Sequence, residues 1–279
     1  APTPTSAAPA APTVIQLSDS SARNGQASWS PDGQQIAFVS NRSGSWELWT
    51  MTADGQQVQQ ITEDAGPAGW PTWTPNGRSL LFYAPGSSGY QLFSVDLETL
   101  VVTPWQENDG DDFRPLLDGD GRRLLFDRVK PGAANHDIFM LDQQNGELTQ
   151  LTSDPAYDSD ARWSPDGTRI VFHSDRGQEA YHTQIYLLVL AEKNLTQLTD
   201  GSAVNGYPSW SPDGAQIVYT AEEDGNRDLW LMDADGSNKV RLTTDQGFDG
   251  DPAFRPDGTA VLFTTDRFGH EELALLLLP

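Results

Sequence analysis

The feature that most constrains this fold is a short turn sequence that recurs along the chain. An aromatic residue or Leu is followed by Ser-Pro-Asp-Gly, or a variant of it, once every 44 to 47 residues. The six copies begin at Trp29, Trp73, Leu117, Trp163, Trp210 and Phe254. A period in this range matches one four-stranded blade of a β-propeller. The repeat therefore predicts six blades.

Each copy has the same internal order of strands and turns. Pro presets φ at the first corner of the turn, Asp can bond to the local backbone, and Gly accepts positive φ, so Ser-Pro-Asp-Gly closes a tight hairpin. The apolar run that follows, 36–39 in the first copy, predicts a strand buried on both faces. A third strand, 48–51, and a fourth that ends at Ile61-Thr62 complete the unit.

The two ends of the chain complement each other. Copies one to five carry a fourth strand, but copy six stops at Pro279 after its third. The segment 14–18, Val-Ile-Gln-Leu-Ser, matches the missing pattern and precedes the first copy. We therefore predict an all-β, six-bladed β-propeller of four-stranded blades over residues 14–279, closed by an N-terminal strand that completes the last blade.

Composition limits the cellular environments and the classes of partner that are expected for this chain. Residues 1–13 are rich in Pro, Ala and Thr, which predicts a linker or stalk, and the start at Ala1 without Met predicts a trimmed, exported product. The chain has 17 basic and 40 acidic residues, a net charge of -23, which disfavours nucleic acid and anionic lipid. The lack of Cys excludes disulfides, and no apolar stretch is long enough to predict membrane insertion.

The repeat resembles that of the TolB-like β-propellers (PD40, a WD40-like repeat family). The shared pattern is Pro-x-Trp-Ser-Pro-Asp-Gly, then motifs such as Asn41-Arg-Ser-Gly44 and Asp233-Ala-Asp-Gly236; the third copy departs most. Similar repeats occur in the periplasmic protein TolB, in surface proteins and in gating domains of prolyl-oligopeptidase-like peptidases. The resemblance implies an extracytoplasmic location, periplasmic, cell-surface or secreted, and ligand binding over one face at the mouth of the channel.

Strand order places the candidate binding residues. Positions three and five residues before each copy should ring the channel mouth, on the face opposite the Ser-Pro-Asp-Gly turns. With nearby loop aromatics, the predicted ligand-binding residues are Trp46, Trp70, Tyr90, Arg114, Tyr181, Tyr207 and Phe268. Aromatic rings there would form platforms for a sugar or peptide. The alternative is that these rings pack onto the next blade.

Acidic residues at the same positions suggest a cation. The predicted ligands of a Ca²⁺ ion are Asp112, Asp158, Asp160, Asp249 and Asp251, because Ca²⁺ prefers carboxylate and carbonyl oxygens. The alternative is that Asp and Asn cap turn amides. We expect Arg42, Arg176 and Arg267 to donate hydrogen bonds between blades.

These patterns favour a function in binding. The four His residues have no metal-binding spacing and no nucleophile motif is present, so we predict no catalytic residue. The predicted function is a non-catalytic extracytoplasmic module that recognises a protein, peptide or glycan. The alternative is a structural subunit of an extracellular assembly or filament, with self-assembly through an N-terminal tail ordered by neighbours or glycans. A lyase or hydrolase is a third hypothesis.

Overall fold

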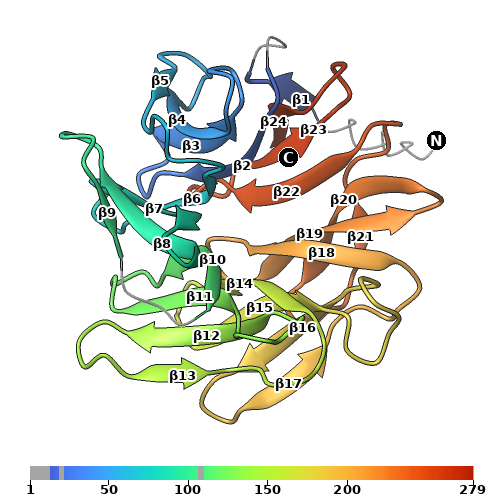
Figure 1. Cartoon of the computed structure of the whole chain (residues 1–279). Coiled ribbons are helices and arrows are strands. Elements are labelled where there is room, and N and C mark those ends of the chain that lie inside the picture. The colour runs from blue at the N-terminus through green and yellow to red at the C-terminus, as the bar shows by residue number, and fades with distance from the viewer. Residues whose placement is uncertain (1–12, 19–21, 106–109, 279) are drawn as a thin grey trace, which may run out of the picture.

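Six four-stranded antiparallel sheets surround a central channel in the computed structural model (Figure 1). The structure describes residues 13–18, 22–105 and 110–278. Blades 1 to 5 are formed by β2–β5, β6–β9, β10–β13, β14–β17 and β18–β21, and blade 6 by β22–β24 together with β1. Nowhere in these ranges is there a helix long and apolar enough to cross a membrane. The predicted six-bladed propeller is confirmed.

In blades 1 to 5 the strands follow one another in chain order from the channel outward, and in blade 6 β22, β23 and β24 are followed by β1. The first strands are β2 (Asn24–Trp29), β6 (Gly69–Trp73), β10 (Asp111–Leu117), β14 (Asp158–Trp163), β18 (Val204–Trp210) and β22 (Asp249–Phe254). The second strands are β3 (Gln35–Ser40), β7 (Ser79–Gly86), β11 (Arg123–Val129), β15 (Arg169–Ser174), β19 (Gln216–Glu223) and β23 (Ala260–Thr265). First strands of neighbouring blades contact each other around the ring, so they line the channel.

The outer half of each blade contains the third and fourth strands. The third strands are β4 (Glu47–Thr52), β8 (Gly89–Asp96), β12 (Asp137–Asp142), β16 (Gln184–Val189), β20 (Asn226–Asp233) and β24 (Glu272–Leu277). The fourth strands are β5 (Gln59–Gln60), β9 (Val102–Pro104), β13 (Leu148–Gln150), β17 (Asn194–Gln197), β21 (Val240–Arg241) and β1 (Thr13–Gln16).

Most fourth strands end before the Leu-Thr or Ile-Thr pair that the repeat places there. Thr62 follows β5, and its hydroxyl accepts a hydrogen bond from the Leu48 N–H at 2.9 Å and donates to Glu47 at 2.5 Å. Thr243 accepts in the same way from Leu229 at 3.0 Å, and Ser18 from Leu273 at 2.9 Å. The hydroxyl thus replaces a backbone acceptor, which is why Thr or Ser recurs where pairing stops.

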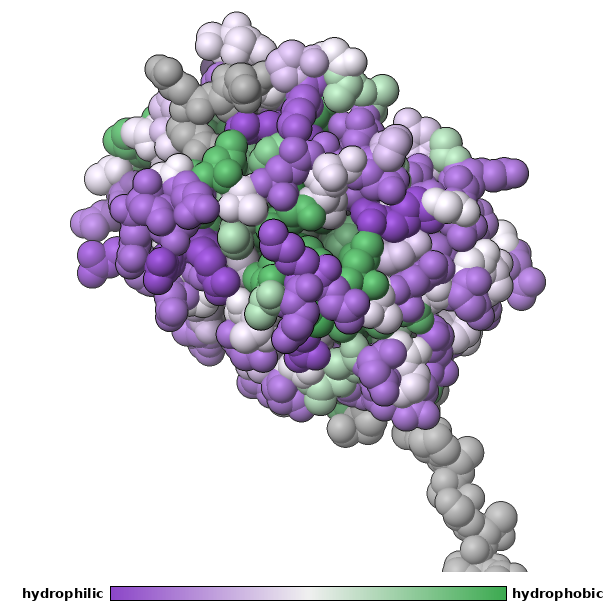
Figure 2. All heavy atoms as spheres, turned by 90° about the horizontal axis from the view of Figure 1, so that it is seen from below, coloured by the Kyte–Doolittle hydropathy of each residue, from purple (hydrophilic) through white to green (hydrophobic). Residues whose placement is uncertain are grey.

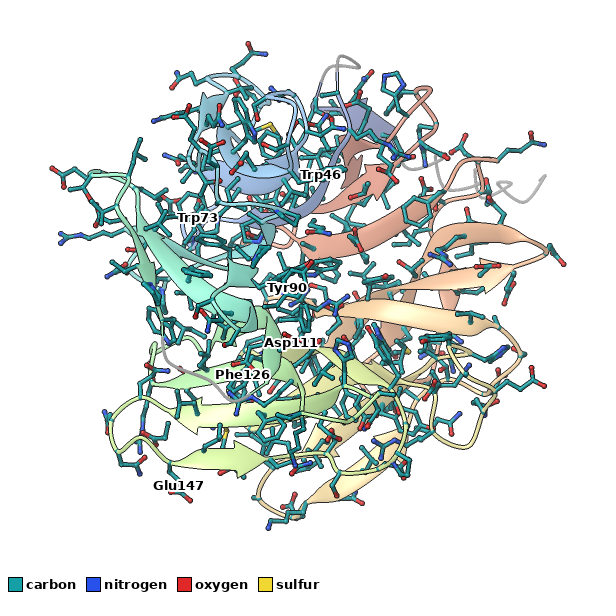
Figure 3. The ribbon with its side chains drawn as sticks, in the orientation of Figure 1. Trp46, Trp73, Tyr90, Asp111, Phe126 and Glu147 are labelled. Carbon is teal, nitrogen blue, oxygen red and sulfur yellow. The ribbon has the colours of Figure 1, made fainter. Side chains whose placement is uncertain are left out.

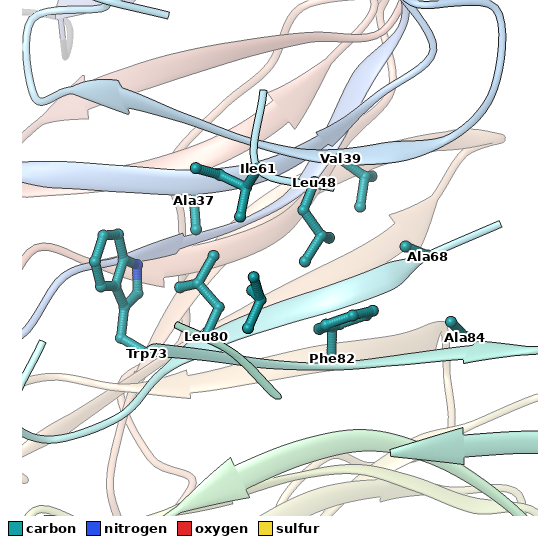
Figure 4. Packing of buried hydrophobic residues seen from close by; sticks show 10 residues of the cluster. Ala37, Val39, Leu48, Ile61, Ala68, Trp73, Leu80, Phe82 and Ala84 are labelled. Atoms are coloured by element: carbon teal, nitrogen blue, oxygen red, sulfur yellow. The ribbon is translucent and has the colours of Figure 1, made fainter. Parts of the chain in front are cut away.

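The core is distributed over the seams between blades. Between blades 1 and 2, Val39 and Leu48 face Leu80 and Phe82 of the next sheet (Figure 4). The Trp that precedes a turn also ties its blade to the one before it, since Trp73 Nε1 donates to the Ser28 carbonyl at 3.2 Å. Burial of two apolar sheet faces against each other supplies the main stabilisation of each seam.

The predicted ring closure is confirmed. β1 pairs with β24 in antiparallel register, with Val14 opposite Leu276 and Ile15 opposite Leu275. Val14 packs against the cluster between blades 5 and 6, whereas Ile15 is 43% exposed. Strand β1 begins at Thr13, one residue before the predicted boundary of the propeller. The rest of the predicted linker, residues 1–12, lies outside the described residues.

Closure provides the first prediction. Val14→Asp places a carboxylate against the apolar seam and should lower the free energy of unfolding by about 1–3 kcal/mol. Ile15→Asp is the matched control on the exposed face of the same strand and should change it by less than about 0.5 kcal/mol. Thermal unfolding followed by circular dichroism measures both. Equal losses of stability would contradict a closure held by the packing of β1.

Candidate binding site at the channel mouth

Six residues with left-handed backbone form a ring around the channel. In each first strand, two residues oppose one residue of the second strand, which makes a β-bulge at the same place in every blade. The first bulge residue has φ between 47° and 58°, and none is Gly: Gln26, Trp70, Arg114, Asp160, Tyr207 and Asp251. Such conformations of non-glycine residues are strained and cluster at functional sites.

Hydrogen bonds from the bulges to the preceding blade help to hold this conformation. The Asp160 N–H donates to Asp127 Oδ2 at 3.2 Å, and the Tyr207 N–H donates to His173 Nδ1 at 3.3 Å. The Trp70 N–H donates to Gln26 Oε1 at 2.9 Å. Each bond crosses a seam, so the position of a ring residue depends on two blades at once.

Aromatic side chains form a continuous arc along one side of the ring. We define the aromatic arc as Trp70, Tyr83, Tyr90, Phe113, His136, Tyr157, His173, Tyr181 and Tyr207. Successive ring centroids lie 4.6 to 6.4 Å apart. Figure 3 places Tyr90 near the middle of the ring, beside Asp111, and Glu147 at the outer rim. The arc spans blades 2 to 5, so the mouth is asymmetric.

A glycine makes room for one ring of the arc. A Cβ atom on Gly69 would lie 2.6 Å from the Tyr83 hydroxyl oxygen and from its ring carbon Cζ. Tyr83 packs edge-on against Phe113 at 5.1 Å and lies near Trp70 at 6.4 Å. The close approach of the Gly69 backbone therefore allows Tyr83 to join blades 2 and 3 of the arc.

Arg114 and Arg227 both line the mouth cavity, and Arg114 is the one that stacks on the aromatic arc. Its guanidinium lies 4.2 Å from the Trp70 ring centroid, bonds Ser159 at 2.8 Å and pairs with Asp127 at 3.2 Å. Burial alone would lower the pKa of Arg114, but Asp127 together with Tyr157, Asp160 and Tyr207 more than offsets this and the pKa is raised. Burial raises the pKa of Asp127 to about 6, against the opposing effect of Arg114. The arginine is held in place by this pair.

Two histidines of the arc are neutral near pH 7. Burial lowers the pKa of His136 and of His173 to about 4. Because His173 Nδ1 accepts the Tyr207 N–H, its proton sits on Nε2. His173 lines a mouth cavity of about 210 Å³ together with Arg114, Tyr157 and Tyr181. The walls of this cavity include no Asp or Glu, although the chain has 40 acidic residues.

The structure brings most of the predicted ligand-binding residues together. Trp70, Tyr90, Tyr181 and Tyr207 belong to the arc, and Arg114 stacks on Trp70. Two others do not join them. Trp46 is partly buried against the apolar cluster between blades 1 and 2, as the packing alternative expects, and Phe268 is 36% exposed without a ring contact in the described part of the chain.

Four of the five predicted calcium ligands are each paired with an arginine, and Asp251 is the exception. Asp112 pairs with Arg128 at 2.6 Å, Asp158 with Arg176 at 2.7 Å, Asp249 with Arg267 at 2.6 Å and Asp160 with Arg162 at 2.7 Å. Over the residues that the structure describes, no group of three or more His, Asp or Glu side chains could hold a metal ion. The calcium site therefore stays a prediction. The alternative interpretation is that these Asp side chains cap turn amides. In the structure four of them instead pair with arginine side chains, because a buried carboxylate requires a partner.

The expectation that these arginines join neighbouring blades is wrong for Arg176, which pairs with Asp158 of its own blade 4. Arg267 pairs with Asp249 of its own blade 6, and also at 2.8 Å with Asp245 in the connection between blades 5 and 6. Arg42 likewise donates to Asn24 of blade 1 at 2.9 Å. The loop between the second and third strands folds back over the start of the first strand, so the nearest buried acceptor lies in the same blade.

Sequence reasoning missed several residues of the mouth, although the repeat contains a signal for them. Tyr83, Asp127, His173 and Thr220 all directly follow the buried aromatic residue of the second strand. His136 and Arg227 occupy the position of Tyr90, two residues before the apolar start of the third strand. Aligning the copies at these two positions would have placed them at the mouth.

A second cavity lies in the channel on the other side of the ring. It measures about 280 Å³ and is lined by Trp29, Pro31, Phe254 and Asp251, among others, with Tyr207 shared between the two cavities. Asp251 has no hydrogen bond or ion pair with any described residue. Burial, with a smaller effect of the neighbouring Asp160, raises the pKa of Asp251 to about 6.

A third hollow lies on the outer rim. It is a groove of about 620 Å³ between blades 3 and 4, with Met140, Leu188 and Leu195 among its walls. Figure 2 views the molecule from below and shows green hydrophobic residues gathered within a mostly purple surface. This groove is separate from the channel.

Asp251 provides the second prediction. Because its folded-state pKa lies above the unfolded value, its contribution to stability is present below pH 3.8 and is lost as the pH rises through about 6. Asp251→Asn should therefore raise the free energy of unfolding at pH 8, by up to about 3 kcal/mol, and leave it unchanged near pH 3. Asp249→Asn, two residues away, breaks the pair with Arg267 and should lower stability at pH 8. Denaturant unfolding at the two pH values measures this; a destabilised Asp251→Asn protein at pH 8 would contradict it.

Known structures share this architecture. TolB from Acinetobacter baumannii superposes with a TM-score of 0.71 at 23% identity, over 87% of this chain and 57% of that one. A putative TolB from Agrobacterium tumefaciens gives 0.74 at 18% identity, over 95% and 97% of the two chains. An oligogalacturonate lyase in complex with manganese gives 0.66 at 17% identity, over 95% and 93%. The chain thus spans a little over half of the A. baumannii protein, and these likenesses concern the fold.

Sequence similarity is more specific. The family model for the TolB beta propeller domain matches residues 10–128, 71–199 and 178–274, which together cover most of the chain. The overlapping matches follow the six repeats on which the fold is built. This protein belongs to the TolB β-propeller domain family.

Proposed function

We propose that this chain is a non-catalytic binding module that works outside the cytoplasm and recognises a protein, peptide or glycan over the channel mouth. The observation that carries the proposal is the aromatic arc, whose rings contact one another from Trp70 to Tyr207. Fixed aromatic rings give contact area at a low entropic cost, and with arginine they dominate binding surfaces. The location outside the cytoplasm rests on the family and its periplasmic member TolB.

The mouth cavity supports recognition of a single protruding group. Its volume of about 210 Å³ is below that of a typical site for a whole small molecule, so a ligand would insert one side chain or one sugar unit and lie over the rest of the arc. Tyr181 is 74% exposed at the rim, where it can contact such a ligand first. Thr220, which is 2% exposed and lines the cavity, has a hydroxyl without a partner in the described residues.

Contacts at the mouth favour binding over catalysis. Asp127 is occupied by Arg114 and Ser159, and His173 Nδ1 by a backbone N–H. Neither histidine of the arc makes a hydrogen bond with a carboxylate in the described structure, whereas a histidine that acts as a general base is commonly oriented by one. The arrangement is suited to holding rings and donors in fixed positions.

The third prediction tests this site with two aromatic residues from equivalent loops. A phage-displayed peptide library and a glycan array are screened against the wild-type protein, and the best ligand is then titrated against variants. Tyr181→Ala should weaken binding at least tenfold, which corresponds to about 1.4 kcal/mol. Phe268→Ala, also an exposed loop aromatic but outside the arc, should leave the Kd unchanged.

Two results would contradict the proposal. Equal affinity of the wild-type and Tyr181→Ala proteins would place the ligand elsewhere. A protein that binds nothing in either screen but forms concentration-dependent assemblies, measured by light scattering, would favour the structural subunit instead.

A further inference from the structure

Asp251 differs from the other carboxylates around the channel because it has no partner in the described structure. Asp127 pairs with Arg114, Asp160 with Arg162, and Asp249, on the same strand, with Arg267. Asp251 makes neither a hydrogen bond nor an ion pair with any described residue, and it lines the 280 Å³ channel cavity. Asp251 is half-buried at the channel wall, and a partly desolvated carboxylate without a partner is costly, so a counter-ion is expected at this place.

The arginines near Asp251 are each paired with another carboxylate, so the negative charge of Asp251 is not balanced within the described structure. Arg114, Arg162 and Arg227 are the cations close enough to interact with it. The first two are taken by the pairs above, and Arg227 pairs with Glu222 at 2.9 Å. Each arginine thus has its own carboxylate, and Asp251 remains. A single positive charge would balance the group.

The walls of the cavity select the kind of cation. Trp29, Trp70, Tyr207 and Phe254 line it, together with the prolines of the turn face. Aromatic faces attract ammonium groups, and apolar walls accommodate methylene groups. Strongly hydrated metal ions prefer several carboxylate and carbonyl ligands, and in the described part of the chain no group of three or more His, Asp or Glu side chains could hold one. The volume holds on the order of nine water-sized groups, enough for a short aliphatic chain.

We propose that this cavity binds an alkylammonium group, with Asp251 as its counter-ion. The group enters from the face of the Ser-Pro-Asp-Gly turns, since Ser30, Pro31 and Pro256 line the cavity there. Its ammonium lies at the bulge ring, and its methylene groups lie among the aromatic and proline side chains. This site is on the opposite side of the ring from the mouth cavity, and it does not depend on the proposed function.

The fourth prediction uses n-butylammonium as the probe, with n-butanol as its neutral counterpart. Isothermal titration at pH 8 and physiological ionic strength should show saturable one-to-one binding of n-butylammonium to the wild-type protein and none of n-butanol. Asp251→Asn should weaken binding at least tenfold. Asp257→Asn removes the same charge from an exposed residue of the same blade and should leave the affinity unchanged.

The outcomes separate a built site from general attraction to an acidic protein. Equal binding by the wild-type and Asp251→Asn proteins, or an equal loss in both variants, would overturn the proposal. So would the absence of saturable binding at millimolar concentrations, which would mean that water alone solvates Asp251. The folding of Asp251→Asn is checked independently by its unfolding curve, where it should be at least as stable as the wild type.

The source of the ammonium group can be resolved with the same titration. A short Gly/Ser peptide with one central Lys, compared with the same peptide carrying norleucine, tests a lysine side chain of a partner. Tighter binding of the Lys peptide than of n-butylammonium would assign the site to a protein partner. Weaker binding of the peptide would assign it to a free aliphatic amine.

Discussion

The antiparallel pairing of β1 with β24 joins the two ends of the chain, and the geometry of the channel depends on it. Val14 and Ser18 bind the last blade from the N-terminal side, the first through packing and the second through the Leu273 N–H. A ring closed in this way shields sheet edges. It also fixes the angle between neighbouring blades, because the rotations at the six seams must add up to one full circle. The seams in turn bring the six bulges to a common axis.

The bulges convert this symmetry into two different cavities. Every blade contributes one left-handed residue at the same position, but the six side chains differ: Gln26, Trp70, Arg114, Asp160, Tyr207 and Asp251. Arg114 and the arc make the mouth cavity rich in aromatic rings and donors. Asp251 gives the channel cavity below it an unpaired negative charge. The fold thus supplies identical positions, and the identity of each side chain decides the chemistry on each side of the ring.

Much of the site could be predicted because the repeat assigns the same place to the same position in each copy. Trp70, Arg114, Tyr207 and Asp251 were located in this way, three residues before each turn. The pairing of the carboxylates could not be predicted by position alone. Asp112, Asp158 and Asp249 look like a cation site in the sequence, yet each faces an arginine of its own blade, brought near by a loop whose path the repeat does not encode. The loop that carries Trp46 likewise follows a path that the repeat does not encode, and this path places Trp46 in the seam between blades 1 and 2.

The sequence by itself determined the number of blades, the order of their strands and the closure by the N-terminal strand, since these follow from local turn chemistry and from a hydrophobic period that every copy repeats. Only the tertiary structure decided which ring residues share a cavity, which acids are neutralised, and that His136 and His173 lie uncharged within one arc. These properties depend on burial and on contacts across seams, where residues far apart in the sequence meet. Charge pairing and pKa are set by that three-dimensional environment and are not encoded by residue type.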